Sequence, residues 1–277
     1  MWLGLCYCCA MWTDVIDLRD FYATSLGQAV SRMLRRRLRD IWPDVHGQRV
    51  LGLGYAVPYL RPFMDEADRV IAAMPPAQGV LPWPAGGQNQ VLLADEAELP
   101  LPDLSMDRVL LIHVVEQTEQ LRPMLREAWR VLAAGGRMIV VVPNRRSLWA
   151  QLDRTPFGQG SPYSAGQLSR LLRDSLFTPV VTTGALFVPP SQSRMMIASA
   201  PAWEKLGLRW FPSFAGVVMV EAVKQIYAPS GFAEPARARR KSRVFAPLSG
   251  GQPRRDACPG LLDRREITSE ERPPGGR

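Results

Sequence analysis

The sequence predicts a three-layer α/β domain with a mainly parallel sheet, and residues 108–143 carry most of that prediction. Two continuous apolar runs, 109–112 and 138–142, are typical of parallel strands that are covered on both faces. Between them, apolar residues recur at helical spacing: Leu121, Leu125, Trp129 and Leu132. A strand, a helix and a strand in this order form a βαβ unit, the building block of parallel sheets.

The elements before this unit follow in order along the chain. The pattern predicts helix over residues 14–42, a strand over 49–54, a short helix over 57–64 and further strands over 69–74 and 91–94. Pro75 and Pro76 stop the second of these strands, and residues 78–90 form a loop rich in proline, tryptophan and glycine. Within the βαβ unit, Gly135 or Gly136 is expected to take the left-handed conformation that closes the helix.

The elements after the unit complete the alternation of helices and strands. A loop over residues 153–163 precedes a helix over 164–176, whose inward residues are Leu168, Leu171 and Leu172. Two β-rich segments, 180–186 and 215–224, close the domain, and a helical stretch at 203–210 precedes the second. In sheets of this kind, ligands bind beyond the carboxyl ends of the strands, where the strand order reverses. The residues directly after each strand are therefore the candidate site.

Composition divides the chain into a domain and two ends. With 47% hydrophobic content, the chain is long enough for one sizeable core, which we assign to residues 11–228. Residues 1–10 are expected to be a flexible or non-native extension. Residues 229–277 are rich in Pro, Gly, Arg and Ser and lack apolar periodicity, so we expect a disordered basic tail. From residue 235 onward, eleven basic and five acidic side chains contribute six of the formal charge of +8.

The basic segments bear on the choice of partner. The tail could neutralise phosphates or lie near an anionic membrane, but without a nucleic-acid motif a solvated end is the preferred interpretation. A second basic cluster falls on a helix expected over residues 28–42, which also has an apolar side: Arg32, Arg35, Arg36, Arg37 and Arg39. We expect this helix to pack on the edge of the domain. Weak contact with a membrane surface through the basic segments is the alternative.

Cysteine usage and hydropathy exclude several classes of protein. Cys6, Cys8 and Cys9 crowd the first ten residues and Cys258 stands alone in the tail, so no tetrahedral zinc site is completed and no metal is expected. No apolar run reaches the roughly 18 residues that span a bilayer, and the first ten residues lack a basic start and a cleavage site. We expect a cytoplasmic protein.

Five ordered pieces of the sequence resemble the class I S-adenosylmethionine-dependent methyltransferases, in the small-molecule branch called type 11. They lie at residues 50–54, 95–100, 107–110, 113–116 and 127–136, and the order of elements is similar to the family's over 14–227. The resemblance implies a Rossmann-like methyltransferase fold, with a mostly parallel, doubly wound sheet of seven strands and an antiparallel last strand. It also implies S-adenosylmethionine as the cofactor, although a fold does not fix a function.

In this family a glycine-rich loop after the first strand brings the backbone close to the cofactor's amino-acid end. By that resemblance, the residues expected to contact the cofactor are Gly52, Leu53, Gly54 and Tyr55. Ala56 and Pro58 replace later glycines of the motif. Because Pro58 lacks an N–H group and has a fixed φ, the chain should turn differently there. A plain strand-to-helix turn is the alternative.

The ribose and adenine positions match the family unequally. Met74 replaces the acid that binds the ribose hydroxyls, and methionine accepts such bonds poorly. Water and backbone would then hold the ribose, or Tyr55 or Glu96 would reach across, or binding would be weak. Asp95 matches the acid that accepts from the adenine amino group, with Glu96 beside it. An exposed pair of loop acids is the alternative.

The chemistry of transfer would lie after the fourth strand. The resemblance places Ile112 and His113 against the cofactor's methionine portion, and imidazole titrates near neutral pH, so His113 is the candidate catalytic base. A structural histidine is the alternative. Methyl transfer mainly requires an aligned nucleophile and the exclusion of water. The acceptor pocket is expected from residues 144–163 and from nearby aromatic side chains: Trp149, Phe157, Tyr163, Trp210 and Phe211.

Two functions stay open and two are disfavoured. The first is methyl transfer to a small-molecule or lipid-like acceptor. The second is a catalytically inactive, methyltransferase-like binding or regulatory module that lost the cofactor through Met74, Ala56 and Pro58. A nicotinamide dehydrogenase is disfavoured because Val57 occupies the third position of the dinucleotide fingerprint. Nucleic-acid base methylation is disfavoured because no base-recognition signature follows the fourth strand.

Overall fold

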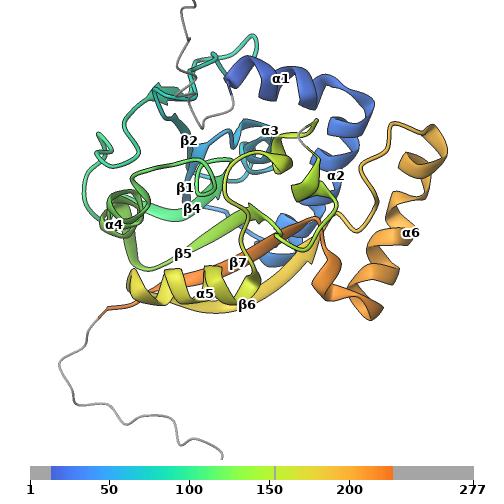
Figure 1. Cartoon of the computed structure of the whole chain (residues 1–277). Helices are drawn as coiled ribbons and strands as arrows, with labels where there is room; N and C mark the ends of the chain where they lie inside the picture. Colours follow the sequence, from blue (N-terminus) through green and yellow to red (C-terminus); the bar gives the residue numbers. More distant parts are fainter. Residues whose placement is uncertain (1–13, 153, 227–277) are drawn as a thin grey trace, which may run out of the picture. The chain divides into compact units, whose positions relative to one another are not determined.

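A seven-stranded sheet runs through the part of the chain that the computed structural model describes, residues 14–152 and 154–226 (Figure 1). Its order is β3-β2-β1-β4-β5-β7-β6. Strands β1 to β5 pair in parallel, and β7 is antiparallel to both β5 and β6. The strands are β1 (Arg49–Gly54), β2 (Arg69–Met74), β3 (Val91–Leu93), β4 (Met106–Ile112), β5 (Leu132–Pro143), β6 (Phe177–Ala185) and β7 (Val217–Lys224). The predicted fold class is confirmed.

Helices cover both faces of the sheet. They are α1 (Val15–Ala23), α2 (Ser25–Ile41), α3 (Val57–Leu60), α4 (Leu121–Val131), α5 (Ala165–Asp174) and α6 (Arg194–Trp210). Buried side chains of α1, α2 and α3 share one core cluster, and those of α4 and α5 share the other. Successive residues of a strand point to opposite faces, so Leu110 enters the first cluster and Leu111 the second. Strands buried on both faces explain the continuous apolar runs.

The helix expected over residues 14–42 is two helices, because the chain breaks at Thr24. The extended backbone of Thr24 ends α1, its hydroxyl donates to Phe21 O at 2.6 Å, and the same oxygen accepts from Gly27 N at 3.0 Å to cap α2. A Cβ on Gly27 would lie 2.1 Å from Phe21 O, so the two helices meet at a contact that only glycine allows. The basic helix α2 buries Leu34 and Leu38 completely, as the packed interpretation expected.

The prediction that the paired glycines close the central helix is wrong. Helix α4 ends at Val131, and Gly135 and Gly136 lie inside β5. Leu132 is fully buried and already pairs with Met106, so the chain enters the strand at once. Gly135 does adopt a positive φ of 76°, within the stretch where the register against β4 shifts. Helix α6 is also longer than its predicted core at 203–210.

Candidate functional site

The strand order reverses between β1 and β4, and the ends of these strands form the candidate site. Gly54 pairs with Ile112, and its φ is 84°. A Cβ there would lie 2.4 Å from Ile112 O, so the close approach of the two strands requires glycine. His113 follows directly, with a φ of 54° that is uncommon for a residue other than glycine. Sparsely populated backbone of this kind is enriched at functional sites.

A buried chain of hydrogen bonds runs through His113. Tyr59 Oη donates to Tyr22 Oη at 2.6 Å, and Tyr22 Oη lies 2.6 Å from His113 Nε2. Since a hydroxyl has one proton, Tyr22 donates its own to Nε2 in this order of bonds. The imidazole proton then lies on Nδ1, which is 3.3 Å from Glu116 Oε1. The side chains of Tyr22, Tyr59, His113 and Glu116 are all buried.

The tyrosines of the site are held in their neutral form. Burial, and next the neighbouring Tyr59, raises the pKa of Tyr22 well above its ordinary value. Burial raises the pKa of Tyr59 as well, and it raises the pKa of Tyr55 to about 12. Each phenol therefore keeps its proton at neutral pH and can act as a hydrogen-bond donor.

Gln78 links the start of α1 to the end of β4. Its Nε2 donates to His113 O at 3.0 Å, and its backbone oxygen accepts from Val15 N at 2.8 Å. Two buried oxygens close to this link, Gln78 Oε1 and Glu116 Oε2, have no hydrogen-bond partner among the described residues. A buried polar atom without a partner costs about 1–3 kcal/mol. A ligand that donated hydrogen bonds to these oxygens would remove that cost.

Side chains of the protein itself fill the crevice beyond β1. The rings of Tyr22 and Tyr55 stack with centroids 5.6 Å apart and planes 17° apart, and Met74, at the end of β2, is fully buried. Four cavities of about 420 to 560 Å³ lie elsewhere, and none is lined by any of the candidate cofactor residues. Tyr22 and Tyr55 thus occupy the space beyond β1 in this arrangement, and Met74 offers a ribose no acceptor.

The two acids after β3 face different surroundings. Asp95 is exposed, and its Oδ1 accepts from Ala97 N at 2.8 Å in a local turn. Glu96 is buried and accepts from Thr118 Oγ1 at 2.8 Å, in the segment after β4. Neither acid joins the bonds around His113 within the described residues, so the structure groups Gly54, Tyr55 and His113 but leaves Asp95 apart.

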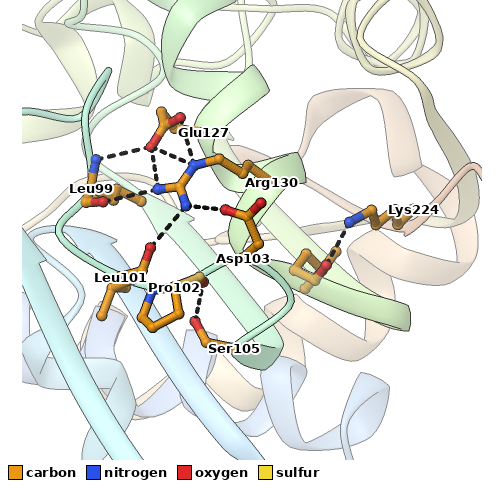
Figure 2. A network of polar contacts seen from close by, with 9 residues as sticks. Leu99, Leu101, Pro102, Asp103, Ser105, Glu127, Arg130 and Lys224 are labelled. Atoms are coloured by element: carbon orange, nitrogen blue, oxygen red, sulfur yellow. Dashed lines mark hydrogen bonds and ion pairs between the residues drawn. The ribbon is translucent and has the colours of Figure 1, made fainter.

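An arginine on α4 holds the loop that follows these acids (Figure 2). Arg130 donates to Leu99 O at 2.9 Å, to Leu101 O at 2.9 Å and to Asp103 Oδ1 at 2.5 Å. Glu127 orients the guanidinium and accepts from Leu99 N at 3.0 Å. The hydrogen bonds that Arg130 donates to Glu127 and Asp103 raise the pKa of Arg130, so the guanidinium stays charged.

Only some of the aromatic residues expected in the acceptor pocket reach the site. The ring of Phe157 lies 4.9 Å from that of His113, and Trp149 packs 5.6 Å from Phe157. Trp210 and Phe211, by contrast, are exposed at the end of α6.

The sequence pattern also missed three residues of the site: Tyr22, Tyr59 and Gln78. A signal for Tyr22 was present, because the buried residues of α1 recur at helical spacing: Val15, Leu18 and Tyr22.

One cluster of the described residues has metal-ligand chemistry. The ligand atoms of Asp44, His46 and Glu66 lie within 4.8 Å of one another, at the surface. However, Asp44 accepts from both the backbone and the ring of His46, and Glu66 pairs with Arg39, which donates to its Oε2 at 2.8 Å. These contacts explain the cluster without an ion.

Comparisons with known proteins agree with the fold, and a family match covers the middle of the chain. A family described as a methyltransferase domain matches residues 77–140. A probable S-adenosylmethionine-dependent methyltransferase of Mycobacterium tuberculosis is 35% identical over 102 residues, which cover 36% of this chain and 37% of that protein. A demethylmenaquinone methyltransferase of Corynebacterium efficiens is 29% identical over 47% of this chain and 57% of its own length. The matches thus span about a third to just over half of these relatives.

Solved structures are similar over a larger part of the chain. A methyltransferase of Thermotoga maritima, described as a possible histamine N-methyltransferase, superposes with a TM-score of 0.52 at 18% identity, over 76% of this chain and 96% of that one. An S-adenosylmethionine-dependent methyltransferase of Mesorhizobium loti gives 0.50 at 17% identity, over 68% and 96%. Identities this low show a shared fold.

Among the described residues, no helix has both the length and the apolar character needed to cross a membrane.

Proposed function

We propose that this chain, which belongs to the class I S-adenosylmethionine-dependent methyltransferases, transfers a methyl group to a small-molecule or lipid-like acceptor. The sheet order and the match over residues 77–140 support this. The observation that carries the proposal is the pairing of Gly54 with Ile112 where the strand order reverses, because ligands of such sheets bind at that point.

Residues at the carboxyl ends of the strands would hold the cofactor. The proposed set is Gly52, Leu53, Gly54, Tyr55, Met74, Asp95, Glu96, Ile112 and His113. Because Tyr22 and Tyr55 fill the crevice, binding requires Tyr22 to leave its place beside His113. Gln78 Oε1 and Glu116 Oε2, which have no partner within the described part of the chain, would then be the acceptors that Met74 cannot supply. The bound cofactor supplies a methyl group on a sulfonium leaving group.

Helix α1 has the features of a lid over this crevice. Polar contacts hold it at both ends: Val15 N donates to Gln78 O at its start, and near its end Tyr22 Oη bonds to both His113 Nε2 and Tyr59 Oη. The extended residue Thr24 separates it from α2 and is the natural hinge. Release of Tyr22 would also free His113 Nε2, which would then be able to accept a proton from an acceptor group.

An apolar acceptor suits the side chains next to His113. Phe157 contacts the imidazole of His113, and Trp149 packs against Phe157. A substrate entering from this side would therefore meet aromatic rings. The Corynebacterium relative is named for demethylmenaquinone, an acceptor of this apolar kind. We therefore favour a ring-bearing or lipid-like acceptor over a strongly polar one.

A cofactor titration tests the proposal. We expect calorimetry to detect binding of S-adenosylhomocysteine to the full chain. Tyr22→Ala should tighten that binding roughly fivefold or more, because less energy is then spent on opening the crevice. Ile16→Ala, an exposed position on the same helix, is the matched control and should leave the affinity unchanged.

The outcome also separates the two functions left open by the sequence. Binding by both chains, with loss of affinity in Asp95→Asn, would support the proposed site. If neither the unaltered chain nor Tyr22→Ala produced heat at millimolar ligand, the enzyme proposal would be wrong and an inactive binding module would be favoured.

A further inference from the structure

The outer face of α6 carries a band of exposed apolar side chains. Met195, Trp203, Leu206 and Trp210 fall within about 80° of one another around an ideal helix. Phe211 and Phe214 extend the band beyond the helix end. Trp210, Phe211 and Phe214 are 65%, 56% and 64% exposed, and Met195 is 80% exposed. We call these six residues the α6 face.

The band is unusual because large apolar side chains gather on a helix that has little else to bury. Helix α6 contacts α2 and β6, and Figure 1 shows it at the edge of the described region, beyond α2. Its fully buried residues are small, Ala200 and Gly207. Contiguous exposed apolar patches on soluble domains usually mark a surface that binds something.

The exposed charges of the same segment are all positive. Arg194, Lys205 and Arg209 are exposed, whereas the acid of α6, Glu204, is half-buried and accepts from Phe187 N at 2.7 Å. On an ideal helix these three cations lie along one border of the apolar band. Aromatic residues bordered by Lys and Arg are the composition of helices that lie in a membrane interface.

A groove next to the face adds further cations. A cavity of about 440 Å³ between α2 and α6 is lined by Arg32, Arg36 and Lys205, by the acids Asp40 and Glu204, and by apolar side chains of both helices. Arg32 and Arg36 are exposed and form no ion pair with any described residue, whereas Arg37, also in the lining, pairs with Asp40 at 3.0 Å. Unpaired guanidinium groups beside an apolar surface suit lipid phosphates.

We propose that the α6 face docks on an anionic lipid bilayer, with its aromatic side chains in the interface and the cations of α2 and α6 against lipid phosphates. A second copy of the chain is a poorer occupant, because a symmetric contact would bring the same positive charges together. A free phosphate ion would use the cations and leave the apolar band exposed. The proposal does not depend on methyl transfer.

Vesicle sedimentation with the full chain tests this docking. We expect binding to phosphatidylcholine vesicles that contain phosphatidylglycerol, and much weaker binding to phosphatidylcholine alone. Replacing Trp203, Trp210, Phe211 and Phe214 together by serine should lower the partition coefficient by roughly tenfold or more. The control variant replaces exposed apolar residues elsewhere by serine and should partition like the unaltered chain: Ile16, Val80 and Val180.

A second variant, with Arg32, Arg36 and Arg209 changed to glutamine, tests the electrostatic part. It should lose roughly tenfold or more of its binding to anionic vesicles. Both variants keep the basic tail, so equal binding by all four chains would assign the interaction to the tail and overturn the proposal. The proposal would also be overturned if vesicles bound none of the four chains and light scattering found an oligomer of the unaltered chain that the serine variant does not form. Circular dichroism confirms that each variant is folded.

Discussion

Gly54 and His113 reach left-handed backbone for different reasons. At Gly54 the nearest atom to a Cβ would be Ile112 O, so the packing of β1 against β4 excludes any other residue. At His113 the same kind of backbone coincides with several hydrogen bonds. Its carbonyl is held by Gln78, and its ring is held by Tyr22 and Glu116. Surrounding hydrogen bonds thus impose a conformation that the residue itself disfavours.

Substitution of Gly54 can be compared with that of Gly47, which has a similar φ of 66° but nothing within 4 Å of its Cβ position. Gly47→Ala should cost about 1–2 kcal/mol of unfolding free energy, from backbone strain alone. Gly54→Ala adds a clash with fixed backbone and should cost about 2–5 kcal/mol. Urea unfolding of both variants measures the difference. Equal losses would mean that the strands do not approach as closely as described.

At the scale of elements, α4 organises the site more than its own burial suggests. The buried residues of α4 are Met124, Leu125, Ala128 and Val131. Leu125 belongs to the predicted stripe, whereas Ala128 and Val131 each stand one position before a predicted residue. Trp129 is half-buried instead and lies under the Lys224 ammonium, 3.9 Å from its ring centroid. The polar side of α4 bears Arg130, whose fork of donors fixes the loop after β3.

Removal of the clamp should loosen that loop. Arg130→Met leaves Leu99 O and Leu101 O without their donor and Glu127 without its cation. We therefore expect the free energy of unfolding to fall by about 1–3 kcal/mol. Hydrogen exchange should speed up over residues 95–105. Arg126→Met, at an exposed position of the same helix, is the control. If the two variants exchanged at the same rate, the clamp would contribute nothing to the order of the loop.

At the scale of the whole molecule, two core clusters on either side of the sheet differ in polarity. The cluster that contains α1, α2 and α3 holds the hydrogen-bonded tyrosines, while the one that contains α4 and α5 is almost entirely aliphatic. A polar network inside one core makes stability depend on protonation. The buried tyrosines of the candidate site therefore also contribute to the stability of the fold.

Stability should fall in alkaline solution. The pKa of Tyr55 is raised to about 12 by burial, and the pKa values of Tyr22 and Tyr59 are raised too, whereas in the unfolded chain they return to ordinary values. The stability from these neutral phenols is complete below about pH 10 and is lost as the pH rises through about 12. Urea midpoints between about pH 9 and 11.5 measure this, and Tyr55→Phe should flatten the slope. An unchanged slope would contradict the burial of its hydroxyl.

Much of the fold could be predicted because strands buried on both faces leave continuous apolar runs. The bounds of β1 and β2 match the predicted ranges, and β4 and β5 extend the predicted runs. Helix ends were harder. Thr24 and Leu132 end helices through their own bonds and burial, and neither has the glycine or proline that usually marks such an end.

For the site, the sequence by itself determined where the strands end, and therefore that Gly54, Met74, Asp95 and His113 lie at one edge of the sheet. Only the tertiary structure decided what occupies the space between them. Tyr22 is 91 residues from His113 along the chain, and nothing in local spacing reveals that its hydroxyl reaches the imidazole. Periodicity reports which face of an element is buried, whereas the partner across that face is chosen by packing between distant segments.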